Sequence, residues 1–320
     1  MNKLKCAVIG VGYLGRFHAQ KYQMLNRAEL IGVCDVNQET SQKVANELNV
    51  VSYNNFHNLF DKVDAVSIAA TTTEHYNIAK EFLARGIHTL IEKPMTRTVS
   101  EANELINIAK KSGAKLQIGH LERFNAARLA VDPFLKKPLF IESQRLATFN
   151  PRGADVNVIL DLMIHDIDII QNMVKSPVLS IEAEGAPVLS SAIDVANARI
   201  TFENHCVANV SASRASLTTE RKTKIFQKNS FISIDYHKKQ FTIFERGKEE
   251  MFPGIPNIIQ KETKFGESDA LLTEINAFVE AILQDTKPLV TGEDGCEALA
   301  IAAKISEQIE GKLSLRYEQL

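Results

Sequence analysis

Residues 5–35 read KCAVIGVGYLGRFHAQKYQMLNRAELIGVCD. An apolar run leads into a Gly-x-Gly-x-x-Gly turn at Gly10, Gly12 and Gly15. A helix-compatible segment follows, and a second apolar run stops at Asp35. This order of strand, glycine turn, helix, strand and acid fits within the roughly 30 residues that a dinucleotide-binding βαβ unit needs. The alternative is a glycine-rich turn in another kind of α/β protein.

The three glycines have separate mechanical roles in such a unit. The first permits the tight turn, the second lets the backbone approach a pyrophosphate, and the third packs the helix against the strand. The helix start, at Tyr13 and Leu14, is expected to hold the phosphates with its backbone N–H groups. Asp35 is placed to accept hydrogen bonds from an adenosine ribose, and its charge repels a 2′-phosphate. We therefore expect NAD rather than NADP as the cofactor.

Length and composition indicate an ordinary two-domain globular protein. The 320 residues exceed what one hydrophobic core usually needs. A net charge of −2 argues against a nucleic-acid-binding surface. The four cysteines include no C-x-x-C pair, which suits a reducing compartment and argues against a disulfide framework or a zinc site. Because no apolar run resembles a membrane span or a signal peptide, we expect a cytoplasmic protein.

Strand and helix patterns alternate after Asp35, as a parallel sheet requires. Helices are expected at 38–48, 74–85 and 101–111, the last capped by Ser100, and strands at 65–70, 88–91 and 115–118. This pattern predicts a doubly wound Rossmann domain over residues 1–122.

Beyond residue 135 the hydrophobic period changes from helical to two. Strands are expected at 140–146, 180–187, 197–202, 206–214, 224–227, 231–236 and 240–244. Two late helices, 270–283 and 292–310, precede a last short strand. Strands without intervening helices are typical of an antiparallel sheet, so residues 123–320 are predicted to form an α+β domain for substrate binding and oligomerisation.

One predicted helix, residues 157–173, is apolar nearly all round and therefore reads as buried. A polar stripe nevertheless follows it, with residues at spacings of four, four, three and four: Asn157, Asp161, His165, Asp168 and Asn172. Buried polar groups need partners or a cavity. The stripe therefore contains either a satisfied Asp–His core pair or a general base oriented by a carboxylate. A zinc site is disfavoured because the stripe lacks a second histidine or cysteine.

The sequence Glu92-Lys93-Pro94 follows directly from a predicted strand. Ligands of doubly wound sheets lie at the carboxyl ends of the strands, so Glu92 and Lys93 are expected beside the cofactor. A lysine there can donate to a substrate hydroxyl and stabilise the developing oxyanion. The alternative is a solvated surface lysine. The sequence leaves open whether the Lys93–Pro94 bond is cis.

Two further stretches are candidates for cofactor contacts. Thr71, Thr72 and His75 follow another strand end, where hydroxyls can line the cofactor site, although Thr72 or Thr73 serves equally well as a plain helix N-cap. Arg123 lies in the segment that connects the two expected domains. It either contacts the cofactor or bridges the domains.

Together these motifs resemble the glucose-fructose oxidoreductase / inositol dehydrogenase (Gfo/Idh/MocA) family over essentially the whole chain. The resemblance rests on the glycine turn, Glu-Lys-Pro at 92–94, Gly-x-x-x-Arg-Phe at 119–124 and Asp-x-x-x-His-x-x-Asp at 161–168. It implies that Lys93 and His165 act on the substrate hydroxyl, with Asp161 as their companion, while the nicotinamide takes the hydride. It also implies a homodimer or homotetramer formed through the outer face of the second sheet.

The chain departs from the common family pattern where glycines often flank the aspartate. Those places hold Asn157, Val158 and Met163. The run 160–168, the stretch 122–125 and Arg145 are instead similar to the sugar-nucleotide branch of the family. That resemblance implies oxidation of C3 of UDP-N-acetylglucosamine, so that an aminotransferase can install an amino group for lipid A.

A sugar nucleotide carries a diphosphate, for which the second domain supplies cations. Arg145, Arg152 and Arg214 are the candidate substrate ligands, and Arg221 and Lys222 lie nearby. Guanidinium groups suit phosphate oxygens, although any one of these side chains can be ordinary surface charge.

The sequence therefore predicts an NAD-dependent sugar dehydrogenase without a metal. His165 takes the hydroxyl proton, Lys93 stabilises the oxygen, and Asp161 orients the pair. Three alternatives stay open: a dehydrogenase of a free sugar or inositol-type polyol, a non-catalytic NAD-sensing regulator, and an NAD-dependent glycosidase.

Overall fold

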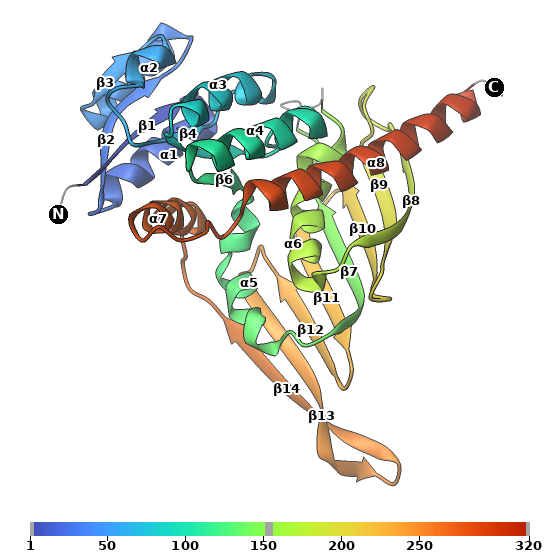
Figure 1. Cartoon of the computed structure of the whole chain (residues 1–320). Helices are drawn as coiled ribbons and strands as arrows, with labels where there is room; N and C mark the ends of the chain where they lie inside the picture. Colours follow the sequence, from blue (N-terminus) through green and yellow to red (C-terminus); the bar gives the residue numbers. More distant parts are fainter. Residues whose placement is uncertain (1–2, 151–155, 318–320) are drawn as a thin grey trace. The chain divides into compact units, whose positions relative to one another are not determined.

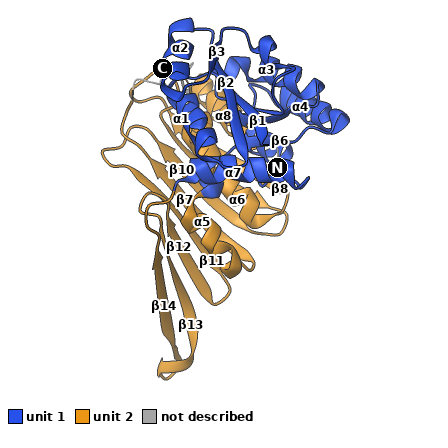
Figure 2. Ribbon diagram, turned by 90° about the vertical axis from the view of Figure 1, so that its left-hand side faces the viewer, with its two compact units in different colours: residues 1–124, 269–299 blue, residues 125–268, 300–320 orange. Residues whose placement is uncertain are grey.

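The computed structural model describes residues 3–150 and 156–317, which form two compact units (Figures 1 and 2). Unit 1 comprises Met1–Phe124 and Asp269–Leu299, and unit 2 comprises Asn125–Ser268 and Ala300–Leu320. The first boundary between the units, after Phe124, lies two residues beyond the domain boundary expected at 122. The chain does not divide into two consecutive segments, however, because residues 269–299 belong to the N-terminal unit.

Unit 1 is built on a six-stranded parallel sheet in the order β3-β2-β1-β4-β5-β6. Its strands are β1 (Leu4–Ile9), β2 (Ala28–Cys34), β3 (Val51–Tyr53), β4 (Ala65–Ile68), β5 (His88–Glu92) and β6 (Leu116–Gly119). Its helices are α1 (Tyr13–Met24), α2 (Gln38–Leu48), α3 (Thr72–Ala84), α4 (Val99–Ser112) and α7 (Ala270–Leu283), with short 3-10 turns η1 (Phe56–Leu59) and η2 (Leu121–Phe124). This strand order is that of dinucleotide-binding sheets and confirms the predicted Rossmann fold.

The cap predicted for α4 at Ser100 is wrong. Thr98 occupies the N-cap, where its hydroxyl accepts from the Glu101 backbone N–H and the Glu101 carboxylate accepts from the Thr98 N–H. Two orphan donors are satisfied reciprocally in such a capping box, so Thr98 outcompetes Ser100. The short strand β3 was not predicted.

Helix α7 reaches unit 1 from far along the chain. Leu271, Ile275 and Phe278 on one face of α7 share a buried cluster with Ala19 and Tyr22 of α1. Just beyond α7, the backbone N–H of Ile118 in β6 donates to the carbonyl of Val290 at 3.1 Å. The core of the nucleotide-binding unit is therefore completed by residues outside the N-terminal segment.

Unit 2 contains an eight-stranded sheet in the order β14-β13-β12-β11-β7-β10-β9-β8. Its strands are β7 (Pro138–Leu146), β8 (Val178–Ala186), β9 (Val195–Phe202), β10 (Val207–Ser213), β11 (Glu220–Gln227), β12 (Ser230–Asp235), β13 (Gln240–Phe252) and β14 (Ile255–Lys264). β7 and β10 are parallel, and the other pairs are antiparallel. Helices α5 (Ala126–Val131) and α6 (Ile164–Val174) pack on one face (Figures 1 and 2). The predicted α+β architecture is confirmed.

The end of the chain differs from the sequence expectation. The strand predicted to end at 244 continues to Phe252 and pairs with the unpredicted β14, forming a long hairpin (Figure 1). Helix α8 (Gly292–Tyr317) runs through the segment expected to form a last short strand. The alternating residues after 311 gave a strand pattern, but no proline interrupts the helix there.

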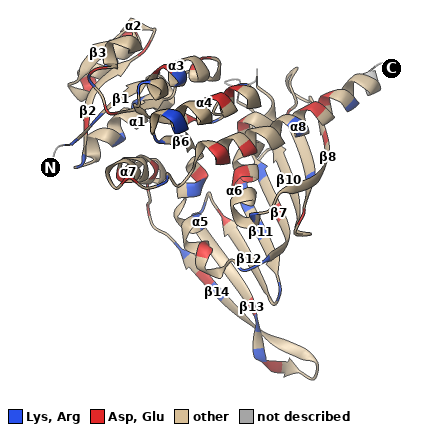
Figure 3. Ribbon diagram, in the orientation of Figure 1, with Lys and Arg blue, Asp and Glu red and all other residues tan. Residues whose placement is uncertain are grey.

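Surface charge is mixed, with acidic and basic residues interspersed along α8 (Figure 3). Among the described residues, no helix is long and apolar enough to cross a membrane. Cys6, Cys34, Cys206 and Cys296 are all buried free thiols.

Candidate active site

The glycine turn has the geometry that its sequence predicts. Gly10 has φ +79°, a left-handed conformation that side chains disfavour. A Cβ on Gly15 would lie 1.8 Å from the Gly10 carbonyl oxygen, so α1 can start this close to β1 only with glycine at that position. A Cβ on Gly12 would meet nothing within 4 Å. Gly12 thus faces open space, as a backbone that approaches a pyrophosphate should.

Asp35 is fixed at the end of β2 by backbone donors. Its Oδ2 accepts from the Val11 N–H at 2.8 Å, and its Oδ1 accepts from the Asn37 N–H at 2.9 Å. The start of α1, where Tyr13 is exposed, has no side-chain cap. First-turn N–H groups of a helix lack intrahelical acceptors and attract anions.

A pocket of about 550 Å³ lies beside these groups. Among its lining residues are Gly10, Gly12, Asp35, Asn54, Phe56 and Thr71. The open space at Gly12, the uncapped helix start and the anchored carboxylate of Asp35 fit the pyrophosphate and ribose of NAD. Leu14, the other residue predicted at the helix start, is partly exposed at the first turn of α1.

After β4, Thr71 lines the pocket beside the glycine turn, and His75 has a structural role. Thr71, at the N-cap of α3, is exposed, and its hydroxyl lies 3.1 Å from that of Thr73, while Thr72 is the first helical residue. His75 is buried, with Nδ1 3.0 Å from the Pro94 carbonyl and Nε2 3.0 Å from the Ala70 carbonyl. Burial lowers the pKa of His75. The His75 ring therefore ties the end of β4 to the turn that contains Lys93.

The Glu92-Lys93-Pro94 segment follows β5, and its Lys93–Pro94 bond is cis. The buried Glu92 carboxylate lies 3.0 Å from Nε2 of His18 through Oε1, and Oε2 accepts from the Lys93 N–H at 3.2 Å. A Cβ on Gly119 would come within 2.9 Å of this carboxyl group, which explains the glycine there. Burial alone raises the pKa of Glu92, but the hydrogen bond from His18 and the charges of His18 and Lys93 outweigh it, and the net shift is downward.

Sequence reasoning did not identify two buried members of this region, His18 of α1 and Glu274 of α7. Both side chains are fully buried. His18 lies on the same buried face of α1 as Gly15, Ala19 and Tyr22. A polar residue on the apolar face of an amphipathic helix was the available signal in both helices.

Arg123 belongs to unit 1 and is 4% exposed. Its Nη2 lies 3.8 Å from Oδ1 of Asp294, at the start of α8. The buried guanidinium therefore takes part in an ion pair with a partly exposed aspartate of the same unit.

In unit 2 the expected helix 157–173 begins with a π-helical turn, η4 (Ile159–Met163), which α6 continues. Asp161 lies on the π turn and His165 on the first turn of α6, and both are partly exposed, whereas Asp168 is buried. π turns inside helices are frequent at functional sites. The polar stripe thus presents two of its members at an irregular helix start.

The ends of the stripe have local partners. Asn157 accepts from the Leu160 N–H at 3.0 Å, and its amide lies 3.1 Å from the Ser306 hydroxyl. Asn172 accepts a hydrogen bond from the Arg128 guanidinium. These two residues hold the helix in place.

Two predicted phosphate ligands, Arg145 and Arg214, are in buried ion pairs. Arg145 Nε lies 2.6 Å from Oδ2 of Asp166, and the arginine is 3% exposed. Arg214 is 4% exposed, and its Nε lies 2.6 Å from Oδ1 of Asp194. Burial raises the pKa of Asp194, but backbone N–H donors and Arg214 lower it to well below its usual range. The third predicted cation, Arg152, lies outside the described residues.

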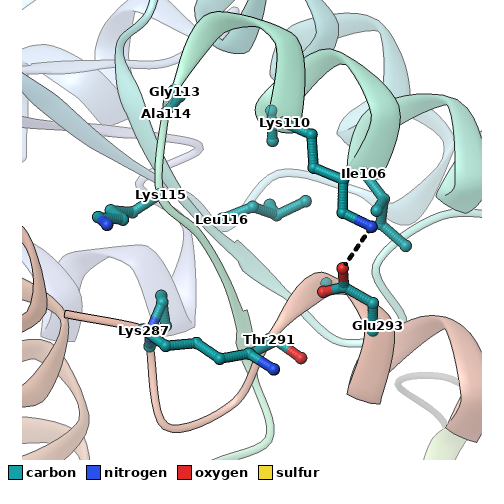
Figure 4. Close-up of a pocket in the computed structure, with 12 residues that line it drawn as sticks. Ile106, Lys110, Gly113, Ala114, Lys115, Leu116, Lys287, Thr291 and Glu293 are labelled. Atoms are coloured by element: carbon teal, nitrogen blue, oxygen red, sulfur yellow. Dashed lines mark ion pairs between the residues drawn. The ribbon is translucent and has the colours of Figure 1, made fainter.

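A second pocket in unit 1, of about 280 Å³, lies between the end of α4 and the start of α8 (Figure 4). Lys110 and Glu293 form an ion pair of 2.8 Å across it, and Lys115 pairs with Asp285 at 2.7 Å. Lys115 precedes β6, so this pocket lies at the amino ends of the parallel strands. Ligands of such sheets bind at the opposite edge.

Comparison with known proteins identifies the family. The family model described as "Oxidoreductase family, NAD-binding Rossmann fold" matches residues 4–120, and the model of the GFO/IDH/MocA C-terminal domain matches residues 117–231. UDP-N-acetylglucosamine 3-dehydrogenase of Acidithiobacillus ferrooxidans is 36% identical over 98% of this chain and 99% of its own length. The chain belongs to the Gfo/Idh/MocA oxidoreductase family. Its unit 1 contains the NAD-binding Rossmann domain of that family.

A further relative and a solved structure agree with this assignment. Myo-inositol 2-dehydrogenase of Thermotoga maritima is 23% identical, with 99% of each chain covered. A solved structure of the A. ferrooxidans UDP-N-acetylglucosamine 3-dehydrogenase superposes with a TM-score of 0.91, covering 97% of this chain and 99% of that one at 36% identity. The sequence comparison and the structural comparison therefore lead to the same fold and the same family.

Proposed function

We propose that this NAD-dependent oxidoreductase oxidises a secondary hydroxyl of a sugar nucleotide, namely C3 of UDP-N-acetylglucosamine, to a ketone. The observation that carries the proposal is the full-length similarity to a UDP-N-acetylglucosamine 3-dehydrogenase, at 36% identity. Similarity to inositol dehydrogenases is weaker, at 23% for the T. maritima enzyme. The departures Asn157 and Met163 from the common glycines of the family also favour a sugar nucleotide over a polyol.

The proposed mechanism gives each of three residues one task. Bound NAD supplies the hydride acceptor at its nicotinamide ring. His165 takes the proton from the substrate hydroxyl, and the carboxylate of Asp161 orients the imidazole and raises its basicity. Lys93 donates to the same oxygen and stabilises its developing negative charge.

Four finer points belong to this proposal. The product ketone is a substrate for an aminotransferase, which would place the reaction ahead of 3-amino-sugar formation for lipid A. The protein acts as a homodimer or homotetramer. Four buried free thiols support a cytoplasmic location. Arg145 and Arg214 pair with buried aspartates, so Arg152, Arg221 and Lys222 are the further predicted cations for the diphosphate.

The substrate is tested by mixing protein, NAD and UDP-N-acetylglucosamine, following reduced-nicotinamide absorbance, and trapping the ketone for mass spectrometry. UDP-glucose, free N-acetylglucosamine and myo-inositol serve as comparison substrates. We expect the highest kcat/KM for UDP-N-acetylglucosamine. Faster oxidation of myo-inositol or of the free sugar would contradict the substrate assignment, and a cleaved sugar without a ketone would indicate a glycosidase.

The proposed catalytic residues are tested by K93A and H165A. Loss of a general base or of oxyanion stabilisation costs about 100-fold or more in turnover. K224A, which removes an exposed lysine from β11, is the matched control and should retain wild-type turnover. Near-normal turnover in K93A or H165A would remove that residue from the mechanism.

A further inference from the structure

Glu274 is a fully buried carboxyl group inside the apolar face of α7. Its neighbours along that face, Leu271, Ile275 and Phe278, belong to the hydrophobic core of unit 1. Both of its carboxyl oxygens are buried and have no hydrogen-bond partner among the residues that the structure describes. An ionised carboxylate in such surroundings is strongly disfavoured unless it is paired. Glu274 therefore needs a protonation state or a partner that accounts for its burial.

Two titratable side chains lie close to Glu274: His18 of α1 and Glu92 at the end of β5. One polar atom from each of the three side chains lies within 4.8 Å of the others, and all three side chains are buried. His18 and Glu92 already contact each other at 3.0 Å. Three elements of one unit thus direct two carboxyl groups and one imidazole into a single buried cluster, below called the His18–Glu92–Glu274 cluster.

The pKa values of the two carboxyl groups in this cluster are shifted in opposite directions. Burial raises the pKa of Glu274, and the negative charge of Glu92 raises it further. The pKa of Glu92 is shifted downward, so its carboxylate carries the negative charge. One polar atom of Glu274 and one of Glu92 lie within 4.8 Å of each other, close enough for the charge of Glu92 to act on Glu274.

Among the described residues, Glu92 is the charged group that raises the pKa of Glu274, and other titratable side chains nearby have partners of their own. Tyr22 of α1 is electrostatically coupled to Glu274, but its hydroxyl is neutral and lies 2.8 Å from the Ser67 hydroxyl. The 3-10 turn η2, which packs against α7, carries Glu122 and Arg123, and Arg123 pairs with Asp294. The positive charge of Lys93 lies next to Glu92 in sequence and acts on it.

We propose that Glu274 is a positioning residue for Lys93: it remains a neutral carboxylic acid and donates a hydrogen bond to the Glu92 carboxylate, which His18 holds from the other side. Glu92 in turn accepts the backbone N–H of Lys93 at 3.2 Å. The orientation of Glu92 therefore fixes the turn that presents the Lys93 side chain. This inference rests on the proposed role of Lys93 in catalysis.

The same residue types occur in metal sites, but the geometry disfavours an ion in the cluster. Nε2 of His18 and Oε1 of Glu92 lie within hydrogen-bond distance of each other, at 3.0 Å, so these two groups can satisfy one another without an ion. The three side chains are also closed off from solvent. Stoichiometric divalent metal in purified protein, lost in E274Q, would overturn the proposal.

The protonation state is tested without turnover. Infrared spectra of the full-length protein in D₂O at neutral pH should contain the carbonyl stretch of a protonated carboxylic acid. E274Q should lose this band. E280Q, which changes a surface carboxylate on the same helix that pairs with Arg27, should retain it. Absence of the band from the wild type, or its persistence in E274Q, would overturn the proposal even if the sugar-nucleotide substrate proved wrong.

The positioning role is tested by comparing E274L with E274Q. Leucine leaves Glu92 without its donor, and displacement of the Lys93 turn should lower kcat at least ~10-fold with KM for NAD changed less. Glutamine is neutral and can donate through its amide, so it should recover most of the turnover that E274L loses. Equal loss in both variants would mean that Glu274 acts as an ionised group, contrary to the proposal. NADH binding and thermal unfolding of both variants verify that they fold. If the wild type does not oxidise UDP-N-acetylglucosamine, the substrate assignment fails, while the infrared result still decides the protonation of Glu274.

Discussion

Replacing Arg214 by methionine should destabilise unit 2 rather than weaken substrate binding. The Arg214 guanidinium donates to Oδ1 of Asp194 at 2.6 Å, to the Ser190 hydroxyl at 3.0 Å and to the Val156 carbonyl. Asp194 is fully buried, so R214M leaves an aspartate charge without its cation. Breaking a buried ion pair on one side costs about 3–5 kcal/mol. Three backbone N–H donors from 188–190 still reach Asp194, which places the expected loss near 3 kcal/mol.

This loss is measurable by calorimetry or by urea unfolding monitored by circular dichroism. At roughly 2–4 °C per kcal/mol for a domain of this size, R214M should lower the Tm of unit 2 by about 6–12 °C. R199A, which removes an exposed arginine of β9 that bonds Asn209, is the control and should change stability by less than about 0.5 kcal/mol. Wild-type stability in R214M together with a raised KM for UDP-N-acetylglucosamine would refute this reasoning and restore Arg214 as a phosphate ligand.

Three further predictions concern unit 1. G15A should lower the free energy of unfolding by more than about 3 kcal/mol, because its Cβ would lie 1.8 Å from the Gly10 carbonyl oxygen. G12A should fold normally but weaken NADH binding about tenfold or more. Thermal unfolding and fluorescence titration of NADH distinguish the two variants, and equal effects would contradict the assigned roles. D35N should reduce the preference for NAD over NADP about tenfold, because it removes the charge that repels a 2′-phosphate. The preference is measured as the ratio of the Kd values of the two cofactors, and an unchanged ratio would exclude Asp35 as the discriminating residue. The pKa of Glu274 is raised in the folded state, so between about pH 4.5 and that pKa the native protein retains a proton that the unfolded chain releases. The free energy of unfolding of the wild type therefore falls as pH rises through this window. E274Q cannot lose that proton, so urea unfolding should show its stability relative to wild type rising by up to about 1.4 kcal/mol per pH unit in this window, and a pH-independent difference would contradict a protonated Glu274.

Local patterns in the sequence predicted the nucleotide-binding unit because its determinants are neighbours in the chain. The glycine turn and Asp35 lie on adjacent elements, and the close approach of Gly15 to Gly10 depends on five residues of sequence separation. The alternating strands of unit 2 were visible for the same reason. The capping box of Thr98 and Glu101 was also readable, as a threonine followed three residues later by a glutamate, but it was missed in favour of Ser100.

The partners of distant charges could not be derived from local patterns. Arg145 was predicted as a cation for the diphosphate, and the sequence did not reveal that the fold brings Asp166 of α6 to within 2.6 Å of its guanidinium. Glu274 joins His18 and Glu92 only because α7 returns to the N-terminal unit. The π turn at 159–163 was likewise not predicted, since its sequence is compatible with an ordinary α-helix.

The central claim is that hydride leaves C3 of UDP-N-acetylglucosamine for the nicotinamide. The most direct measurement uses UDP-N-acetylglucosamine deuterated at C3 with unlabelled NAD, followed by mass spectrometry of the reduced cofactor. The account predicts one deuterium in the reduced nicotinamide and a ketone without the label. Reduced cofactor free of deuterium, or a ketone that retains the label, would contradict it.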